Sequence, residues 1–330
     1  MKQFKLYLII LLIFLINPLI AQTIAELTQQ ITQGKTTDST KVEAIYDWLT
    51  HNVSYDNARR RHREGDTVLY QEPYNVVRLK KAVCMGYAKT FREICRLSSI
   101  ESYVIEGWAK SESGTLEREG HAWNVVKINN NWYLADATWD AGNALESKKY
   151  YLSTPSVFVQ NHLPHDPMWQ LLTTPISVDC FTNKRYCPNI STVGNFNFTD
   201  TIRLWQTLDE TQQVYNQSLR IVHFNPNDLM PIRELAEYYT LQAKNLYAEY
   251  AKIRVEITIK KQGNYPKIAV LDLLNTMTNY LITAQSHYQT LVDKTKHSSL
   301  TDAHFNIQLL QDTLNQISEE KKFVERYLKH

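Results

Sequence analysis

The sequence predicts an α+β domain followed by an all-α helical bundle. Apolar residues at helical spacing begin near Cys84, and strand-like segments follow them between residues 101 and 140. From about residue 195 onward, apolar residues recur three and four positions apart. A helix followed by consecutive strands favours a helix packed on an antiparallel sheet, whereas the later pattern is typical of a bundle of about four helices.

Length and composition agree with two folded units. The chain has 330 residues, of which 43% are hydrophobic and 21% are charged, as in globular proteins. Its net charge of +2 gives no electrostatic basis for nucleic-acid binding, so we expect no nucleic-acid partner. We place the α+β domain at residues 22–190 and the helical bundle at residues 195–330.

The N-terminus resembles an export signal. Lys2 and Lys5 precede an apolar run at residues 6–16, which is shorter than the roughly 20 residues that span a bilayer. A basic start, a short apolar run and a small residue at position 21 predict a secretory signal peptide at residues 1–21, cut after Ala21. An uncleaved anchor is the alternative. We therefore expect an exported protein, periplasmic or extracellular, without a stable membrane span after cleavage.

Two helical segments lead toward the sheet. Residues 23–56 predict one or two helices, with Asp38 or Ser39 as the N-cap of the second. The next helix begins near Cys84, and its apolar residues face a core. These residues include Tyr87, Phe91, Ile94 and Cys95.

Three segments predict strands, and the last two form a hairpin around three consecutive asparagines. If Asn129 and Asn130 form a two-residue turn, Ile128 pairs with Asn131. The predicted strands are residues 101–110, 121–128 and 132–140. The Pro- and aromatic-rich segment that follows, up to about residue 172, indicates little regular structure.

The register of this hairpin decides which polar groups share a face. With the Asn129–Asn130 turn, His121 lies opposite Thr138, and Asp136 lies diagonal to His121 on the same face of the sheet. A turn centred one residue later favours Asp140 instead of Asp136.

The four cysteines allow one short bridge. Export permits disulfides, and Cys180 and Cys187 are close enough in sequence to pair or to stay free. Cys84 and Cys95 would lie about 16 Å apart on one helix, beyond the roughly 7 Å that a disulfide spans. We therefore expect Cys95 to be a buried thiol. The sequence has no CxxC or HxxxH pair, so we predict no metal site and no cofactor.

The residue types and their order point to thiol chemistry. A cysteine at a helix N-terminus is in a position that favours the thiolate. His121 would be its base and Asp136 would orient the histidine. Gly86 would leave room for a substrate backbone near the sulfur. Trp123 shares the face of His121, which makes it a candidate for a substrate-binding groove as well as for the core.

Three stretches carry a resemblance to a known family. They are AVCMGYAKTFREICR at residues 82–96, GHAWNVVKINNNWYLADATWD at 120–140 and YYLSTPSVFVQNHLPHDPMWQLL at 150–172. They resemble the transglutaminase-like superfamily, specifically its kyphoscoliosis-peptidase-like bacterial branch, over about residues 40–180. The resemblance implies a papain-like fold with Cys84 as nucleophile, His121 as base and Asp136 as orienting group. The family usually has glycine where this chain has Ala82.

The resemblance implies acyl transfer on a protein or peptide substrate. A peptidase or amidase results if water is the acceptor, and a transglutaminase results if an amine is the acceptor. The alternative is a catalytically weak or inactive scaffold that binds a partner through the bundle and an aromatic groove. The bundle carries no chemical motif, and we expect it to act as a scaffold or to bind an unknown protein partner.

Overall fold

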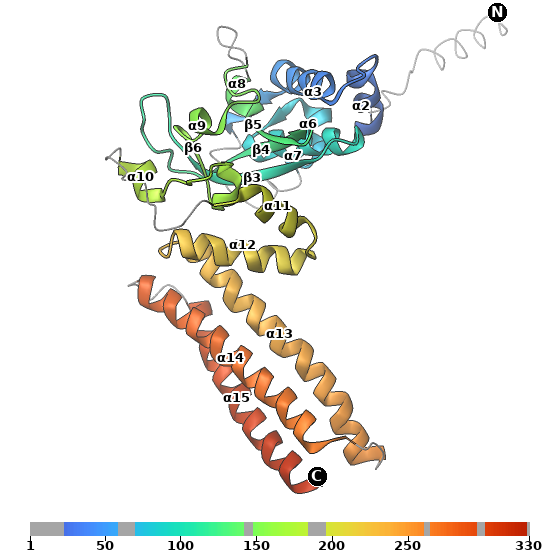
Figure 1. Ribbon diagram of the computed structural model, residues 1–330, viewed down its shortest axis with the longest axis vertical. Coiled ribbons are helices and arrows are strands. Elements are labelled where there is room, and N and C mark those ends of the chain that lie inside the picture. The colour runs from blue at the N-terminus through green and yellow to red at the C-terminus, as the bar shows by residue number, and fades with distance from the viewer. Residues whose placement is uncertain are drawn as a thin grey trace, which may run out of the picture. The chain divides into compact units, whose positions relative to one another are not determined.

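The computed structural model describes residues 23–58, 70–141, 148–183, 196–260, 265–295 and 301–328 (Figure 1). The predicted signal peptide lies outside these residues. Two compact units share the chain: Met1–His165 with Trp169–Leu172, and Asp166–Met168 with Thr173–His330. In the described part of the chain, no helix is both long enough and apolar enough to cross a membrane.

The first unit contains a four-stranded antiparallel sheet in the order β5-β4-β3-β6. Its strands are β3 (Ser102–Ala109), β4 (His121–Ile128), β5 (Asn131–Ala135) and β6 (His162–Pro164). Asn129 and Asn130 have φ values of 49° and 63°, as a two-residue primed turn requires. Ile128 pairs with Asn131, so the predicted turn and register are confirmed.

The helix α7 (Cys84–Leu97) packs against β3 and β4. It also contacts α2 (Ile24–Thr32), α3 (Asp38–Asn52) and α6 (Pro73–Leu79). Cys95 is fully buried in this core, as predicted, and burial raises the pKa of its thiol. The N-cap of α3 is Thr37, one residue before Asp38 and two before Ser39, the two predicted caps, and its hydroxyl accepts the backbone N–H of Thr40.

A short two-stranded sheet fixes the approach to α7. The strands β1 (Ser54–Tyr55) and β2 (Lys81–Ala82) pair in parallel. Tyr87 then donates its hydroxyl hydrogen bond to the carbonyl of Val53. These contacts hold the chain just before α7 and the first turn of α7 against the segment that follows α3.

The edge strand β6 lies in the Pro- and aromatic-rich segment after the hairpin, where we predicted little regular structure. The chain reaches it through α8 (Ala137–Asp140) and α9 (Pro155–Phe158), and the 3₁₀ helix η1 (Pro167–Gln170) follows. Gly107 on β3 pairs with Pro164, and a Cβ at Gly107 would lie 2.1 Å from the carbonyl oxygen of Leu163. Glycine is therefore required at this position for β6 to join the sheet.

The second unit is helical. Its elements are α10 (Val178–Asn183), α11 (Phe198–Gln206), α12 (Glu210–Phe224), α13 (Leu229–Val255), the π-helical turn η2 (Glu256–Lys260), α14 (Lys267–Thr295) and α15 (Thr301–Tyr327). The apolar faces of α13, α14 and α15 form a separate core. The chain between Phe198 and Phe224 is divided into two helices, α11 and α12, because the side chain of Asp209 caps a new helix by accepting the backbone N–H of Gln212.

The two units divide near residues 165–173, earlier than the boundary we expected near residue 190. Asp166 belongs to the helical unit, where Arg220 on α12 donates to its carboxylate at 2.7 Å. Cys180 on α10 is disulfide-bonded. Cys187, the candidate partner that the sequence offers, lies outside the described residues.

Candidate active site

Cys84 is the first residue of α7, where the sequence places it. Its thiol is free and half-buried. Val83 precedes it as the N-cap, in extended conformation and without a side-chain cap. Because the first N–H groups of a helix have no partner within the helix, they favour negative charge at this end.

A glutamine not identified from the sequence supports this turn. Gln71 is 5% exposed, and its side-chain oxygen accepts the backbone N–H of Val83 at 3.1 Å. A Cβ at Gly86 would lie 2.4 Å from that oxygen and 2.8 Å from the Cβ of Ala82. Gly86 is therefore needed for close packing beneath the turn, which replaces the substrate-contact role that we predicted for it.

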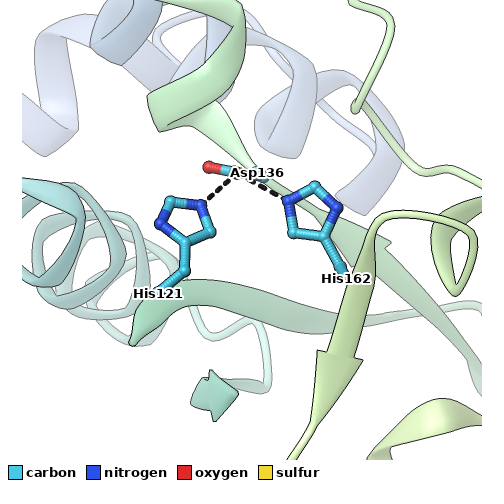
Figure 2. A group of neighbouring side chains, drawn as sticks. All are labelled: His121, Asp136 and His162. Carbon is cyan, nitrogen blue, oxygen red and sulfur yellow. Dashed lines mark hydrogen bonds and ion pairs between the residues drawn. The ribbon is translucent and has the colours of Figure 1, made fainter. Parts of the chain in front are cut away.

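His121 is the first residue of β4, opposite Gly107 of β3. Its side chain is 9% exposed, and its Nε2 lies 2.6 Å from Oδ2 of Asp136 (Figure 2). The sequence thus correctly predicted that these two residues meet.

The way Asp136 reaches His121 differs from the prediction. The strand β5 ends at Ala135 and does not continue to Thr138, so Asp136 is the N-cap of α8. Its Oδ1 accepts the backbone N–H of Thr138 at 2.8 Å and of Trp139 at 3.4 Å. One carboxylate oxygen therefore caps a helix while the other is directed at the imidazole.

The alternative carboxylate, Asp140, is held elsewhere. Its Oδ2 accepts the hydroxyl of Tyr46 at 2.5 Å and the backbone N–H of Tyr150 at 3.0 Å. Burial raises the pKa of Asp140, and the bond from Tyr46 opposes that effect. Asp140, at the end of α8, thus makes its hydrogen bonds to Tyr46 and Tyr150 and not to His121.

The charges in the site favour a protonated imidazole. Burial alone lowers the pKa of His121, but the negative charge of Asp136 and the hydrogen bond to it outweigh burial. A side-chain hydrogen bond and a charge interaction with Cys84 act in the same direction, and together they raise the pKa of His121 to about 10. Burial raises the pKa of Asp136, yet its interactions with His121 and His162 hold that pKa well below the usual range.

Trp123 does not line a groove. Its side chain is 1% exposed and packs against the rings of Phe158 and His162, with centroids 5.8 and 5.2 Å away. Among the described residues its Nε1 has no hydrogen-bond partner. The predicted substrate-binding role is wrong for this geometry, because the face that Trp123 shares with His121 is covered by the segment after α8. Trp139, 5.3 Å from the His121 ring, encloses the imidazole.

The site contains a second histidine that the sequence analysis did not identify. His162, on β6, is 0% exposed, and its Nε2 lies 3.1 Å from the same Oδ2 of Asp136 (Figure 2). The sequence signal was present in the short HLP stretch at residues 162–164, but nothing local showed that this stretch joins the sheet edge next to the hairpin.

His121, Asp136 and His162 offer three possible metal ligands within 4.8 Å of one another. Ligands held about 2.0–2.1 Å from a tetrahedral zinc ion lie roughly 3.3 Å apart. The 2.6 Å separation between His121 Nε2 and Asp136 Oδ2 is instead that of a charge-assisted hydrogen bond. We therefore assign a proton to the contact between His121 and Asp136.

Comparisons with known proteins find similar sequences and structures over part of the chain. A family model described as the transglutaminase-like superfamily matches residues 25–137. Human kyphoscoliosis peptidase is 32% identical over 178 residues, which cover 49% of this chain and 26% of that protein. Hillarin from Drosophila melanogaster is 24% identical over 208 residues, which cover 54% and 24%. A solved structure of a TGase aligns at 20% identity and a TM-score of 0.29, over 39% of this chain and 33% of that one.

The chain spans about a quarter of the length of these curated relatives. The family match runs from α2 to the start of α8, and this range contains Cys84, His121 and Asp136. Within it, an α+β arrangement carries a cysteine at a helix start and a bonded His–Asp pair on the neighbouring hairpin. Residues 25–137 of the chain thus match the transglutaminase-like superfamily, and this match is the part of the chain to which the family applies.

Proposed function

We propose that this protein catalyses acyl transfer on protein or peptide amides, with Cys84 as nucleophile, His121 as acid and base, and Asp136 as the orienting group. The observation that carries the proposal is the buried 2.6 Å bond between His121 and Asp136. The interaction with Cys84 that helps to raise the pKa of His121 supports it further.

The reaction follows from these charges. The Cys84 thiolate attacks the carbonyl carbon of an amide, and the imidazolium of His121 gives its proton to the departing amine, which leaves a thioester on Cys84. Water or a second amine then attacks the thioester and loses a proton to His121, and the thiolate is regenerated. The backbone N–H of Cys84 and one further donor would hold the oxyanion in both steps.

The acceptor decides the product. Water gives a peptidase or amidase, and a primary amine gives a transglutaminase. Kyphoscoliosis peptidase is named for the first activity, and this favours hydrolysis as the first assay. We also propose export through the signal at residues 1–21, on the basis of its basic start and short apolar run.

Alkylation of Cys84 tests the proposal directly. The chain without its predicted signal is treated with iodoacetamide at pH 7, and the modified residue is identified by mass spectrometry. We expect Cys84 to react much faster than a free model thiol, and Cys84→Ala to abolish the fast reaction. The fully buried Cys95 provides the slow internal reference.

A rate at Cys84 no higher than that of the model thiol would instead support the scaffold alternative, in which the helical unit binds a partner. If Cys84 is reactive, a labelled peptide library with and without a primary amine separates hydrolysis from cross-linking. The same library run with Cys84→Ala is the control.

A further inference from the structure

Two imidazoles share one oxygen of Asp136. Oδ2 lies 2.6 Å from His121 Nε2 and 3.1 Å from His162 Nε2, and the two rings approach it from opposite sides (Figure 2). Oδ1 is already occupied by the two backbone N–H groups at the start of α8. The carboxylate is therefore held by four donors, of which His162 is the one that the proposed mechanism does not use.

His162 has no access to a substrate. Its side chain is 0% exposed, and four aromatic rings enclose it. Their centroids lie 4.2 Å (Phe158, stacked), 4.4 Å (Trp139), 5.2 Å (Trp123) and 5.2 Å (Tyr150) from its own. Any effect of His162 on a reaction must therefore pass through Asp136.

The environment indicates that His162 is neutral. Burial lowers the pKa of His162 to about 4, although Asp136 opposes that effect. A neutral imidazole has one N–H, and the ionised Asp136 can only accept, so the proton belongs on Nε2. Nδ1 is then an acceptor.

Asn161 completes this assignment. Its Oδ1 lies 2.8 Å from His162 Nδ1, and its Nδ2 lies 2.8 Å from the hydroxyl of Tyr150. Because the two ends of an amide have the same shape, its orientation follows from the hydrogen bonds. A neutral His162 requires the reverse orientation, in which the NH₂ group donates to Nδ1 and the amide oxygen accepts from Tyr150. A continuous chain of donors then runs from Tyr150 through Asn161 and His162 to Asp136.

We propose that His162 is a positioning residue of this site, whose Nε2–H holds Asp136 Oδ2 against His121. The proposal rests on the proposed function of Cys84, His121 and Asp136. A neutral donor adds no charge that would compete with the imidazolium of His121. It also prevents the carboxylate from rotating away, and it stabilises the ionised form of Asp136 that keeps His121 protonated beside the thiolate.

Two substitutions separate the donor from the bulk of the ring. His162→Leu keeps an apolar side chain and removes the N–H, whereas His162→Gln places an NH₂ group near the position of Nε2. We expect His162→Leu to slow iodoacetamide alkylation of Cys84 at pH 6 by roughly 10- to 100-fold, the range for loss of a hydrogen bond to a charged group. We expect His162→Gln to restore most of the rate. His51→Leu, at an exposed position on α3, is the matched control and should leave the rate unchanged.

The pH profile distinguishes positioning from general loss of structure. Between pH 5 and 9 the rate of the His162→Leu variant should fall most at low pH, because the thiolate forms by itself at high pH. ¹⁵N NMR of the unmodified protein should show His162 protonated at Nε2, bare at Nδ1, and unchanged from pH 6 to 8. This measurement does not depend on any variant folding.

The possible failures are distinguishable. Slow alkylation of the unmodified protein would overturn the proposed function itself. If that protein reacts quickly and Asp136→Asn reacts slowly, a His162→Leu variant with wild-type rates at every pH overturns the role of His162. A folded His162→Gln variant as slow as His162→Leu, or a proton on Nδ1 of His162 in place of Nε2, overturns it as well.

Discussion

Asp136 Oδ2 lies 2.6 Å from His121 Nε2 even though the strand leading to Asp136 ends one residue before it. The two-residue turn at Asn129–Asn130 sets the pairing of β4 and β5, and the start of α8 then turns the carboxylate back toward the imidazole. Asp136 therefore serves two purposes, as a helix cap through Oδ1 and as the partner of His121 through Oδ2.

These two purposes can be separated by substitution. Asp136→Asn keeps a side chain that caps helices well but removes the charge. We expect alkylation of Cys84 at pH 7 to slow by about 10-fold or more, with little loss of stability, because His121 loses its anionic partner. Asp136→Ala should show the same slowing and a further loss of about 0.5–2 kcal/mol in the free energy of unfolding. Equal alkylation rates in Asp136→Asn and the unmodified protein would contradict the proposed role of Asp136.

Asp140 should show the opposite pattern. Its carboxylate is bonded to Tyr46 and to the backbone of Tyr150, and it does not reach His121. We expect Asp140→Asn to lower the free energy of unfolding by about 1–3 kcal/mol and to leave the alkylation rate of Cys84 nearly unchanged. Urea unfolding followed by circular dichroism measures the first effect. A large fall in the alkylation rate of a folded Asp140→Asn variant would restore Asp140 as a candidate.

The His121–Asp136 pair should make stability depend on pH. The folded-state pKa of His121, about 10, lies above its ordinary value of 6.5. Its contribution to stability is thus complete below about pH 6.5 and is lost as the pH rises through about 10. The pKa of Asp136 is lowered, so its contribution is present above its ordinary value and is lost as the pH falls through the lowered one.

The difference in unfolding free energy between the unmodified protein and His121→Gln measures this contribution. We expect it to shrink by at least about 1 kcal/mol between pH 6.5 and 10. Groups elsewhere titrate equally in both proteins and cancel in the difference. A constant difference over this range would show that Asp136 and Cys84 do not raise the pKa of His121.

Replacement of Gly86 by alanine, the smallest substitution, should destabilise the protein. Gly→Ala inside a helix normally stabilises by up to about 1 kcal/mol, but a Cβ here would overlap the Gln71 oxygen and the Ala82 methyl group. Overpacking of this kind costs about 1–3 kcal/mol, so we expect Gly86→Ala to lower the free energy of unfolding. Denaturant titration of Gly86→Ala, alone and combined with Gln71→Ala, tests whether removing the glutamine relieves the strain. A stabilised Gly86→Ala variant would show that the turn has room for a substrate after all.

Features that depend on neighbouring residues were predictable from the sequence. The start of α7 follows from the spacing of its apolar residues, and the hairpin follows from Asn129 and Asn130, which tolerate positive φ. Because both are local, the meeting of His121 and Asp136 could be predicted. The early end of β5 could not, because it depends on the N-cap bonds that Asp136 makes with the next turn.

Features that depend on distant segments were not predictable. Gln71 contacts Val83 across 12 positions, and His162 contacts Asp136 across 26, with no periodic pattern to connect them. Trp123 shows the same limit. Strand parity correctly placed it on the face of His121, but parity does not show that Phe158 and His162 cover that face.

The turn at Asn129–Asn130 has a consequence for which changes in chain length the protein can accept. Side chains alternate between the two faces of β5, so one inserted residue would move every later side chain of that strand to the other face. Leu134, which is now buried, would then point to the opposite face of the sheet. Asp136 would also be displaced, and its carboxylate would no longer face His121. This loop is therefore constrained in length as well as in composition, because both of its residues must also adopt positive φ, whereas most surface loops accept insertions readily.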